Sequence, residues 1–270
     1  MADQARLIPV SARSRISIAL VSVVGLASFL WPLFVVPGSG LDDAATAPLI
    51  LAALLPLFLV VVLAEMGRGG FDVKAIAMLG VLSAVGAALR PLGAGAGGLE
   101  TVFFLLVLAG RVYGPGFGFV LGATTLLGSA LLTGGVGPWL PFQMMASAWV
   151  GLGAGLLPRC RGRLEIALLV AYGALAGLAF GLVMNFSFWP FTVGLENQLS
   201  YVPGAAVVEN LHRFVIFSVT TSLGWDLGRA LTNAVAILVV GPAVLSALRR
   251  IARRAAFGTV GTDRTVAHEQ

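Results

Sequence analysis

Long apolar segments constrain this chain more than any other feature. Several run for about 20 residues, which is the length a helix needs to cross the hydrocarbon core of a bilayer. The segments are 16–36, 46–66, 74–91, 99–112, 115–133, 139–157, 164–188 and 222–248. The sequence therefore predicts an all-α integral membrane protein with about eight transmembrane helices in total.

Composition excludes the soluble classes. Only 11% of the residues are charged, and the mean hydropathy is +0.97. Soluble domains carry about 25% charged residues, and disordered chains are also rich in charge and poor in apolar residues. The excess of Lys and Arg over Asp and Glu is expected to mark membrane topology, so no nucleic-acid partner is predicted.

The basic residues predict the orientation of the helices. Most of the 17 Lys and Arg residues fall on alternate loops, whereas Asp42, Asp43, Glu196 and Glu209 lie on the opposite loops. Basic loops stay on the cytoplasmic side of a membrane. Both termini are therefore predicted to be cytoplasmic in a multi-pass protein of the cell (plasma) membrane.

Glycine and polar content divide the chain into three parts. Residues 1–70 contain two Leu- and Val-rich segments with few polar residues, and we expect a two-helix transmembrane addition there. Residues 71–257 are expected to form a six-helix substrate-binding membrane core, and 258–270 a disordered cytoplasmic tail. Within the core, 99–112 is too short to span alone, so we expect it either to tilt or to be sheltered by neighbouring helices. The stretch 205–221 is expected to form a shorter helix outside the bilayer or partly within it.

Small residues form two patterns in the predicted core. Gly80, Ala84 and Ala88 stand four residues apart, which is the spacing of close helix contacts in membranes. This row either docks another subunit or packs within the chain. The glycine-rich stretch 114–122 has no Lys-Ser or Lys-Thr ending, so helix packing is favoured there over phosphate binding.

The run from Gly134 to Gln143 combines glycines, two prolines, Trp139 and an amide that enters the membrane. Such a rigid turn suits either contact with a small ligand or a purely structural connection, in which Trp139 anchors at the headgroups. Both interpretations stay open.

Ionisable residues at membrane depth are functional candidates by default. Arg90 and Glu100 flank a glycine-rich loop, and they either pair with each other or bind a ligand. Asp226, Arg229 and Asn233 share one helix face, where Asp226 and Arg229 either satisfy each other or line an outward cavity. The predicted substrate-binding residues are Arg90, Glu100, Trp139, Gln143, Asn185, Trp189, Trp225, Asp226 and Arg229.

Two motifs carry a resemblance to a known family. The stretches Gly110–Gly122 and Gly137–Met144 resemble the substrate-binding (S) component of an energy-coupling factor (ECF) vitamin transporter, nearest to its cobalamin-type branch. The similarity covers Lys74–Arg254, and the two N-terminal helices are a departure from the family's six.

The resemblance implies an ABC importer subunit for vitamin uptake. Such a subunit captures a vitamin-like small molecule, cobalamin as the first prediction, from outside the cell. It then docks on a transmembrane coupling subunit that two ATPase subunits drive. The family docks through small residues of its first core helix, which correspond here to Gly80, Ala84 and Ala88. The chain itself is then not an enzyme, and no cofactor or metal is expected.

Missing motifs bear on the alternatives. There is no Walker A sequence and no His-Glu-x-x-His zinc motif, so neither ATP hydrolysis of that kind nor that metal site is predicted. A self-sufficient secondary transporter remains an alternative, with Glu100 and Asp226 as coupling carboxylates. An intramembrane hydrolase using Ser129 and His212 is disfavoured, because the glycines of a strained nucleophile turn do not surround Ser129.

Overall fold

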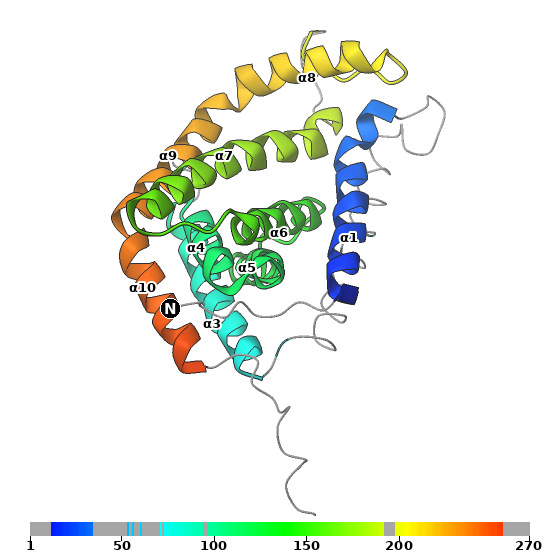
Figure 1. The fold of residues 1–270 in the computed structure, drawn as a ribbon. Coiled ribbons are helices and arrows are strands. Elements are labelled where there is room, and N and C mark those ends of the chain that lie inside the picture. The colour runs from blue at the N-terminus through cyan, green and yellow to red at the C-terminus, as the bar shows by residue number, and fades with distance from the viewer. Residues whose placement is uncertain are drawn as a thin grey trace, which may run out of the picture.

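The computed structural model describes residues 12–34, 73–93, 97–191 and 198–255, together with positions 53, 56, 60 and 71. Within these ranges the regular structure is entirely helical (Figure 1). The α-helices are α1 (Ala12–Leu30), α3 (Val73–Leu89), α4 (Phe103–Tyr113), α5 (Pro115–Thr133), α6 (Leu140–Leu156), α7 (Gly162–Phe188), α8 (Val207–Thr221), α9 (Leu223–Val239) and α10 (Gly241–Ala255). Short 3-10 turns follow three of them, namely η1 (Trp31–Phe34), η2 (Arg90–Leu92) and η3 (Trp189–Phe191).

Several of these helices have the length and the apolar composition of membrane spans. Within the described residues, four are long and apolar enough to cross a bilayer: Ala12–Phe34, Val73–Leu92, Pro115–Thr133 and Gly162–Phe191. A fifth span is possible if α9 and α10, which bend by 65° at their junction, count together. The predicted segment 46–66 lies largely outside the described residues, as do the tail 258–270 and most of the N-terminal unit 1–70.

The prediction of one continuous helix over 222–248 is wrong. The chain breaks between α9 and α10, next to Gly241 and Pro242. Proline has no backbone N–H, and its ring collides with the carbonyl four residues earlier, here that of Leu238. The backbone therefore turns and starts a new helix, which carries Arg249, Arg250, Arg253 and Arg254.

Of the two alternatives for the short segment 99–112, shelter by neighbouring helices is the one that the structure shows. Helix α4 has 11 residues, nearly all buried, and it packs against α5, α6, α7, α9 and α10. The expectation of a separate helix within 205–221 is confirmed by α8, whose Phe214 and Phe217 are buried while Val208 and Val215 are exposed.

Helices α5 and α6 lie at the centre of the fold, with the other helices around them (Figure 1). Glycines let these two helices touch through their backbones. A Cβ on Gly118 or on Gly151 would collide with the backbone carbonyl of the other, and a Cβ on Gly122 would meet the carbonyl of Ser147. The predicted packing role of 114–122 is therefore confirmed.

This contact gives a stability prediction. We expect Gly151→Ala to destabilise the protein by about 1–3 kcal/mol, because the added methyl group separates two backbones that touch. Thermal melting in detergent, followed by tryptophan fluorescence, measures the effect. The control is Gly80→Ala, since a Cβ on Gly80 meets no described atom and alanine favours a helix. Equal melting temperatures for Gly151→Ala and the wild type would contradict the close contact.

The core helices run in alternate directions between two ends. At one end, the Lys74 Nζ donates to the carbonyl of Ala255 at 3.0 Å, and the Tyr113 hydroxyl donates to that of Leu248 at 3.2 Å. We call this the arginine-rich end, because Arg111 and the arginines of α10 gather there. The other end brings together η2, the segment before α4 and the N-terminus of α9, and it holds the site described next.

Candidate ligand-binding site

A cavity of about 330 Å³ lies at the end of the fold opposite the arginines. Four parts of the chain form it: η2, the segment 97–100, the last turns of α5 and the first turns of α9. Its lining residues are Arg90, Pro91, Gly98, Leu99, Glu100, Ser129, Thr133, Trp225 and Arg229. Four of the nine predicted substrate-binding residues thus share one cavity, although they come from three separate elements.

Arg90 brings a positive charge to this cavity. Its Nη2 donates to Gln143 Oε1 at 3.1 Å, which connects η2 to the first turn of α6. Its Nε is buried and has no hydrogen-bond partner among the described residues. The alternative in which Arg90 pairs with Glu100 is wrong, because Glu100 binds a different arginine.

That other arginine is Arg229, the centre of a buried ionic network. Its Nε donates to Glu100 Oε2 at 2.6 Å, and its Nη1 donates to Asp226 Oδ1 at 2.7 Å. Nη1 also lies 3.3 Å from the carbonyl of Gly177, and the guanidinium lies 5.2 Å from the centre of the Phe180 ring. The pair of Asp226 and Arg229 is therefore not self-contained, because it joins α9 to α7 and to the segment before α4.

The glycine-rich loop reaches the cavity by lying directly on α9. Gly98 has a φ of 81°, and a Cβ there would collide with the backbone of Trp225. A Cβ on Gly228 would collide with the carbonyl of Gly97. Only glycine allows this close approach, which sets Leu99 and Glu100 beside Arg229.

Two hydroxyl side chains of α5 complete the cavity wall, and neither was predicted as a binding residue. Ser129 is buried, and its Oγ has no hydrogen-bond partner among the described residues. Thr133 lies one turn later and donates to the carbonyl of Ser129 at 2.8 Å. Their four-residue spacing at the end of an apolar helix was the signal that could have found them.

Other predicted residues lie outside this cavity. Trp139 is half exposed and packs over Gly137. The Asn185 amide donates to Ser218 Oγ at 3.2 Å and accepts from Ser222 Oγ at 3.1 Å, so it connects α7 to the end of α8. Trp189 is buried against Phe214, and its Nε1 donates to the carbonyl of Leu199 at 2.7 Å. Asn185 and Trp189 thus connect the end of α7 to α8 and to the segment before it, whereas Trp139 lies at the start of α6.

The small residues of α3 face two ways. The row of Gly80, Ala84 and Ala88 is exposed along its whole length. The neighbouring row faces α5, where Ser83 Oγ and Thr124 Oγ1 lie 2.7 Å apart and Ala87 packs beside Gly128. Packing within the described chain therefore uses the second row and leaves the first one uncovered.

The arginine-rich end holds an ionic cluster that the sequence analysis did not single out. Glu165, at the start of α7, accepts from Arg111 Nε at 2.8 Å and from Arg249 Nη2 at 2.6 Å. Arg111 also donates to the carbonyls of Leu157, Pro158 and Cys160. The cluster fastens α4, α7, α10 and the loop after α6 to one another.

The residues that an intramembrane hydrolase or a metal site would need do not lie together in the described part of the chain. Ser129 lines the cavity, whereas His212 is exposed on α8 and is not part of the lining. In the described ranges, no three His, Cys, Asp or Glu side chains lie close enough to hold a metal ion.

Comparison with protein-family models, with curated proteins and with solved structures found no match for the chain. The assignment of a function therefore depends on the residues and on the geometry of the site.

Proposed function

We propose that this chain is the substrate-capturing membrane subunit of an importer of the energy-coupling factor type. The observation that carries the proposal is the cavity that Arg90 and Ser129 both line; the Arg90 Nε and the Ser129 Oγ are buried and have no hydrogen-bond partner among the described residues. Buried polar groups without partners are costly, so they favour a ligand that completes their hydrogen bonds.

The position of the cavity supports uptake from outside the cell. It lies at the end opposite the arginines, and basic residues mark the cytoplasmic face of a membrane protein. In this proposal, both termini are cytoplasmic in the plasma membrane, about eight helices span it, and the cavity opens outward. The exposed row of Gly80, Ala84 and Ala88 is then the docking face for a coupling subunit that two ATPases drive.

The lining indicates the chemical class of the ligand. Among the described residues no carboxylate pairs with Arg90, so an anionic group of the ligand can bind there. The network of Glu100, Arg229 and Asp226 carries one negative charge overall and favours donor groups at the other side of the cavity. Trp225 also lines the cavity and adds an aromatic residue to it. A small vitamin-like organic acid with a planar part meets these conditions.

The volume bears on the first ligand prediction. Cavities for small molecules span roughly 300–1,000 Å³, and this one lies at the lower end of that range. Cobalamin is a macrocycle with an attached nucleotide, and it is too large to be enclosed by a space of about 330 Å³. We therefore propose a smaller micronutrient as the captured ligand.

Arg90→Gln tests the site directly. The full chain is purified in detergent, co-purified small molecules are identified by mass spectrometry, and their carboxylate and carboxamide forms are compared by calorimetry. Replacing the charge is expected to weaken binding of the carboxylate roughly tenfold or more, since hydrogen bonds to charged groups contribute about 1.5–3 kcal/mol. Binding of the carboxamide form is expected to change little.

Two tryptophan substitutions extend this test, one inside the cavity and one outside it as the control. Trp225→Ala is expected to weaken binding, because Trp225 lines the cavity, whereas Trp139→Ala is expected to leave the affinity unchanged, because Trp139 does not. A protein that purifies empty and shows no thermal shift with a panel of water-soluble vitamins would contradict the proposed function.

A secondary transporter is the second candidate, and one observation favours it. Glu100 and Asp226 are largely buried carboxylates joined by an arginine, an arrangement that is also found where transporters couple protons or ions. Uptake into proteoliposomes that contain only this chain would support it. Uptake that requires added ATPase and coupling subunits would support the importer subunit instead.

A further inference from the structure

Helix α8 lies across the end of the fold that holds the ligand cavity, crosswise to α1 (Figure 1). It packs against η1 at the end of α1, against the end of α7 and against α9. Only Ser222 separates it from α9, whose first turn carries Trp225 of the cavity wall. Both ends of α8 therefore lie at the cavity end, and α8 is not one of the described helices that are long and apolar enough to cross a bilayer. The proposed function does not involve this helix.

One side of α8 is buried against the rest of the chain. The Phe214 ring stacks on that of Phe186, with 3.6 Å between the ring centres, and Phe217, one turn later, is buried as well. The Asn210 amide donates to the carbonyl of Val202 at 2.8 Å. These contacts fix the rotation of α8 about its own axis.

A second side of α8 is apolar and exposed. It consists of Val208, Leu211, Val215 and Val219, which follow each other at spacings of three or four residues and so form one stripe. Their exposed fractions run from 42% to 78%. The stripe lies roughly a third of a turn away from the buried side. Aliphatic side chains exposed together in this way are costly in water, so the stripe favours an apolar surrounding.

The third side of α8 is polar. Glu209 and Thr220 are exposed there, and Glu209 accepts a hydrogen bond from Arg213 at 2.8 Å. This side also lies roughly a third of a turn from the apolar stripe, in the other direction. A helix surrounded by lipid would not carry this polar side, and a helix surrounded by water would not carry the apolar one. The three sides of α8 thus match three different surroundings, namely protein, lipid and water.

The apolar stripe continues into the membrane part of the fold. Val219 is followed at four-residue spacings by Leu223, Leu227 and Leu231 of α9, which are all exposed. Helix α9 forms a possible span together with α10, so its exposed leucines are expected to face lipid chains. Because the stripe of α8 joins this surface without a break, lipid is favoured over a partner protein as its contact.

We propose that α8 lies in the plane of the membrane surface, with Val208, Leu211, Val215 and Val219 among the acyl chains of the leaflet at the cavity end. Helices with separate apolar and polar faces lie at such an interface, with the apolar face about 5–10 Å into the boundary between headgroups and acyl chains. Glu209 and Thr220 then face the water. His212 is exposed between the two faces and falls at the headgroups, because its ring has an apolar body and a polar tip.

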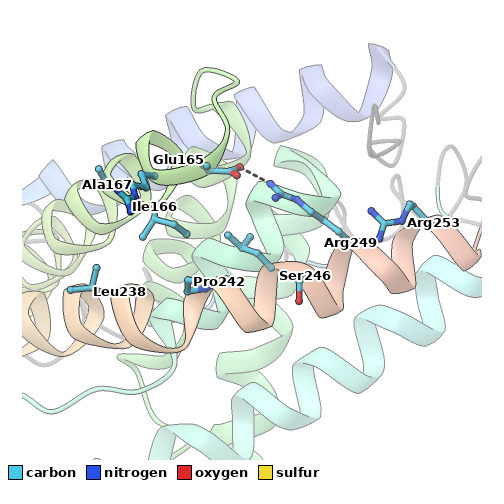
Figure 2. A pocket seen from close by; sticks show the side chains of 11 residues that line it. Glu165, Ile166, Ala167, Leu238, Pro242, Ser246, Arg249 and Arg253 are labelled. Atoms are coloured by element: carbon cyan, nitrogen blue, oxygen red, sulfur yellow. Dashed lines mark hydrogen bonds and ion pairs between the residues drawn. The ribbon is translucent and has the colours of Figure 1, made fainter. Parts of the chain in front are cut away.

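The two ends of the fold differ in charge. At the far end, Arg249 bonds to Glu165, and Arg249 and Arg253 line a groove between α7 and α10 (Figure 2). On α8 the charges of Glu209 and Arg213 balance each other, so its contact with lipid needs no anionic headgroups. In the outward orientation of the proposed function, the leaflet at α8 is the outer one. The contact with lipid itself is expected in either orientation and with any captured ligand.

Spin labels on the full chain in vesicles of dioleoyl phosphatidylcholine test the depth of α8. The chain has a single cysteine, Cys160, so Cys160→Ser is the background for one new cysteine at a time. With Val215→Cys, the label is expected about 5–10 Å below the phosphates, where oxygen reaches it better than a water-soluble nickel chelate does. Thr220→Cys is the matched control on the polar side, where the chelate is expected to reach the label better than oxygen. Leu231→Cys, on the exposed face of α9, marks the hydrocarbon core.

Two further labels test whether α8 lies in the membrane plane. Val208→Cys and Val219→Cys stand near the two ends of the stripe, and their labels are expected at the same depth as that of Val215→Cys. Each of these positions is exposed, so a label there displaces no buried side chain.

Four results would overturn the proposal. Equal access of the chelate to the labels at Val215 and Thr220 would place α8 in water. An immobile label at Val215 that neither reagent reaches would show that protein covers the stripe, from a second copy or from elsewhere in the chain. A label at Thr220 as deep as the one at Leu231 would place α8 in the hydrocarbon core. Unequal depths at Val208 and Val219 would show a helix that crosses the leaflet at a steep angle.

Discussion

Glu165→Gln is expected to lower the free energy of unfolding by about 3–5 kcal/mol, because it leaves arginines without their counter-charge inside the fold. The Glu165 side chain is 3% exposed and that of Arg111 is 7% exposed. Arg111 Nε and Arg249 Nη2 both donate to the same carboxylate oxygen of Glu165, Oε1. A neutral amide keeps the shape but removes the charge that balances two guanidinium groups.

The matched control for this substitution is Glu209→Gln. Glu209 also pairs with an arginine, Arg213, at 2.8 Å, but its side chain is 51% exposed and the pair lies within one helix turn. Exposed pairs of this kind contribute about 0.3–0.5 kcal/mol. The melting temperature in detergent is expected to fall by on the order of 10 °C for Glu165→Gln, and by a small fraction of that for the control. Similar shifts in the two variants would show that the buried cluster does not hold the helices together.

The helical class and the close packing of the glycines could be predicted from the sequence, because apolar length and glycine spacing act locally. A segment of 11 to 14 apolar residues is too short to span alone, which left tilting or shelter by neighbours as alternatives, and α4 is buried among five helices. Glycines at four-residue spacing bring backbones together, and Gly118 does touch α6. The break between α9 and α10 was not predicted, because the apolar run in the sequence continues across Pro242. The helix itself cannot continue straight through this proline.

The partners of the charged residues could not be predicted in the same way. Arg90 and Glu100 are close in sequence, and their opposite charges suggested a pair. The structure instead joins Glu100 to Arg229, which lies 129 positions away, and gives Arg90 an amide from α6. Pairing between residues so far apart in the sequence depends on how the helices cross. Residue types and their spacing do not specify these crossings.

Buried polar and aromatic residues look alike in a sequence whether they bind a ligand or hold helices together. Asn185 and Trp189 were predicted as binding residues, and the structure shows both with hydrogen-bond partners inside the chain. Ser129 has no such partner and lines the cavity. An unsatisfied buried group is the better indicator of a ligand, and it can be recognised only from coordinates.

A second large effect on stability is expected for the ionic network of Glu100, Arg229 and Asp226, which lies at the end of the fold opposite Glu165. Arg229→Met is expected to destabilise the fold by about 3–5 kcal/mol, because it leaves the carboxylates of Glu100 and Asp226 without the cation between them. The side chains of Arg229, Glu100 and Asp226 are 13%, 18% and 11% exposed, so water screens them little. Loss of Arg229 also removes the contact that holds the segment before α4 against α9.

A variant in which all three residues of the network are uncharged separates the effect of charge on stability from that of packing. In the triple variant Arg229→Met/Glu100→Leu/Asp226→Val no buried charge is left unbalanced, and replacing a buried ionic network by hydrophobic residues of similar volume often costs little stability. The triple variant is therefore expected to recover most of the melting temperature lost in Arg229→Met. If both variants melt at the same reduced temperature, the guanidinium acts by filling space over Phe180 rather than by balancing the two carboxylates.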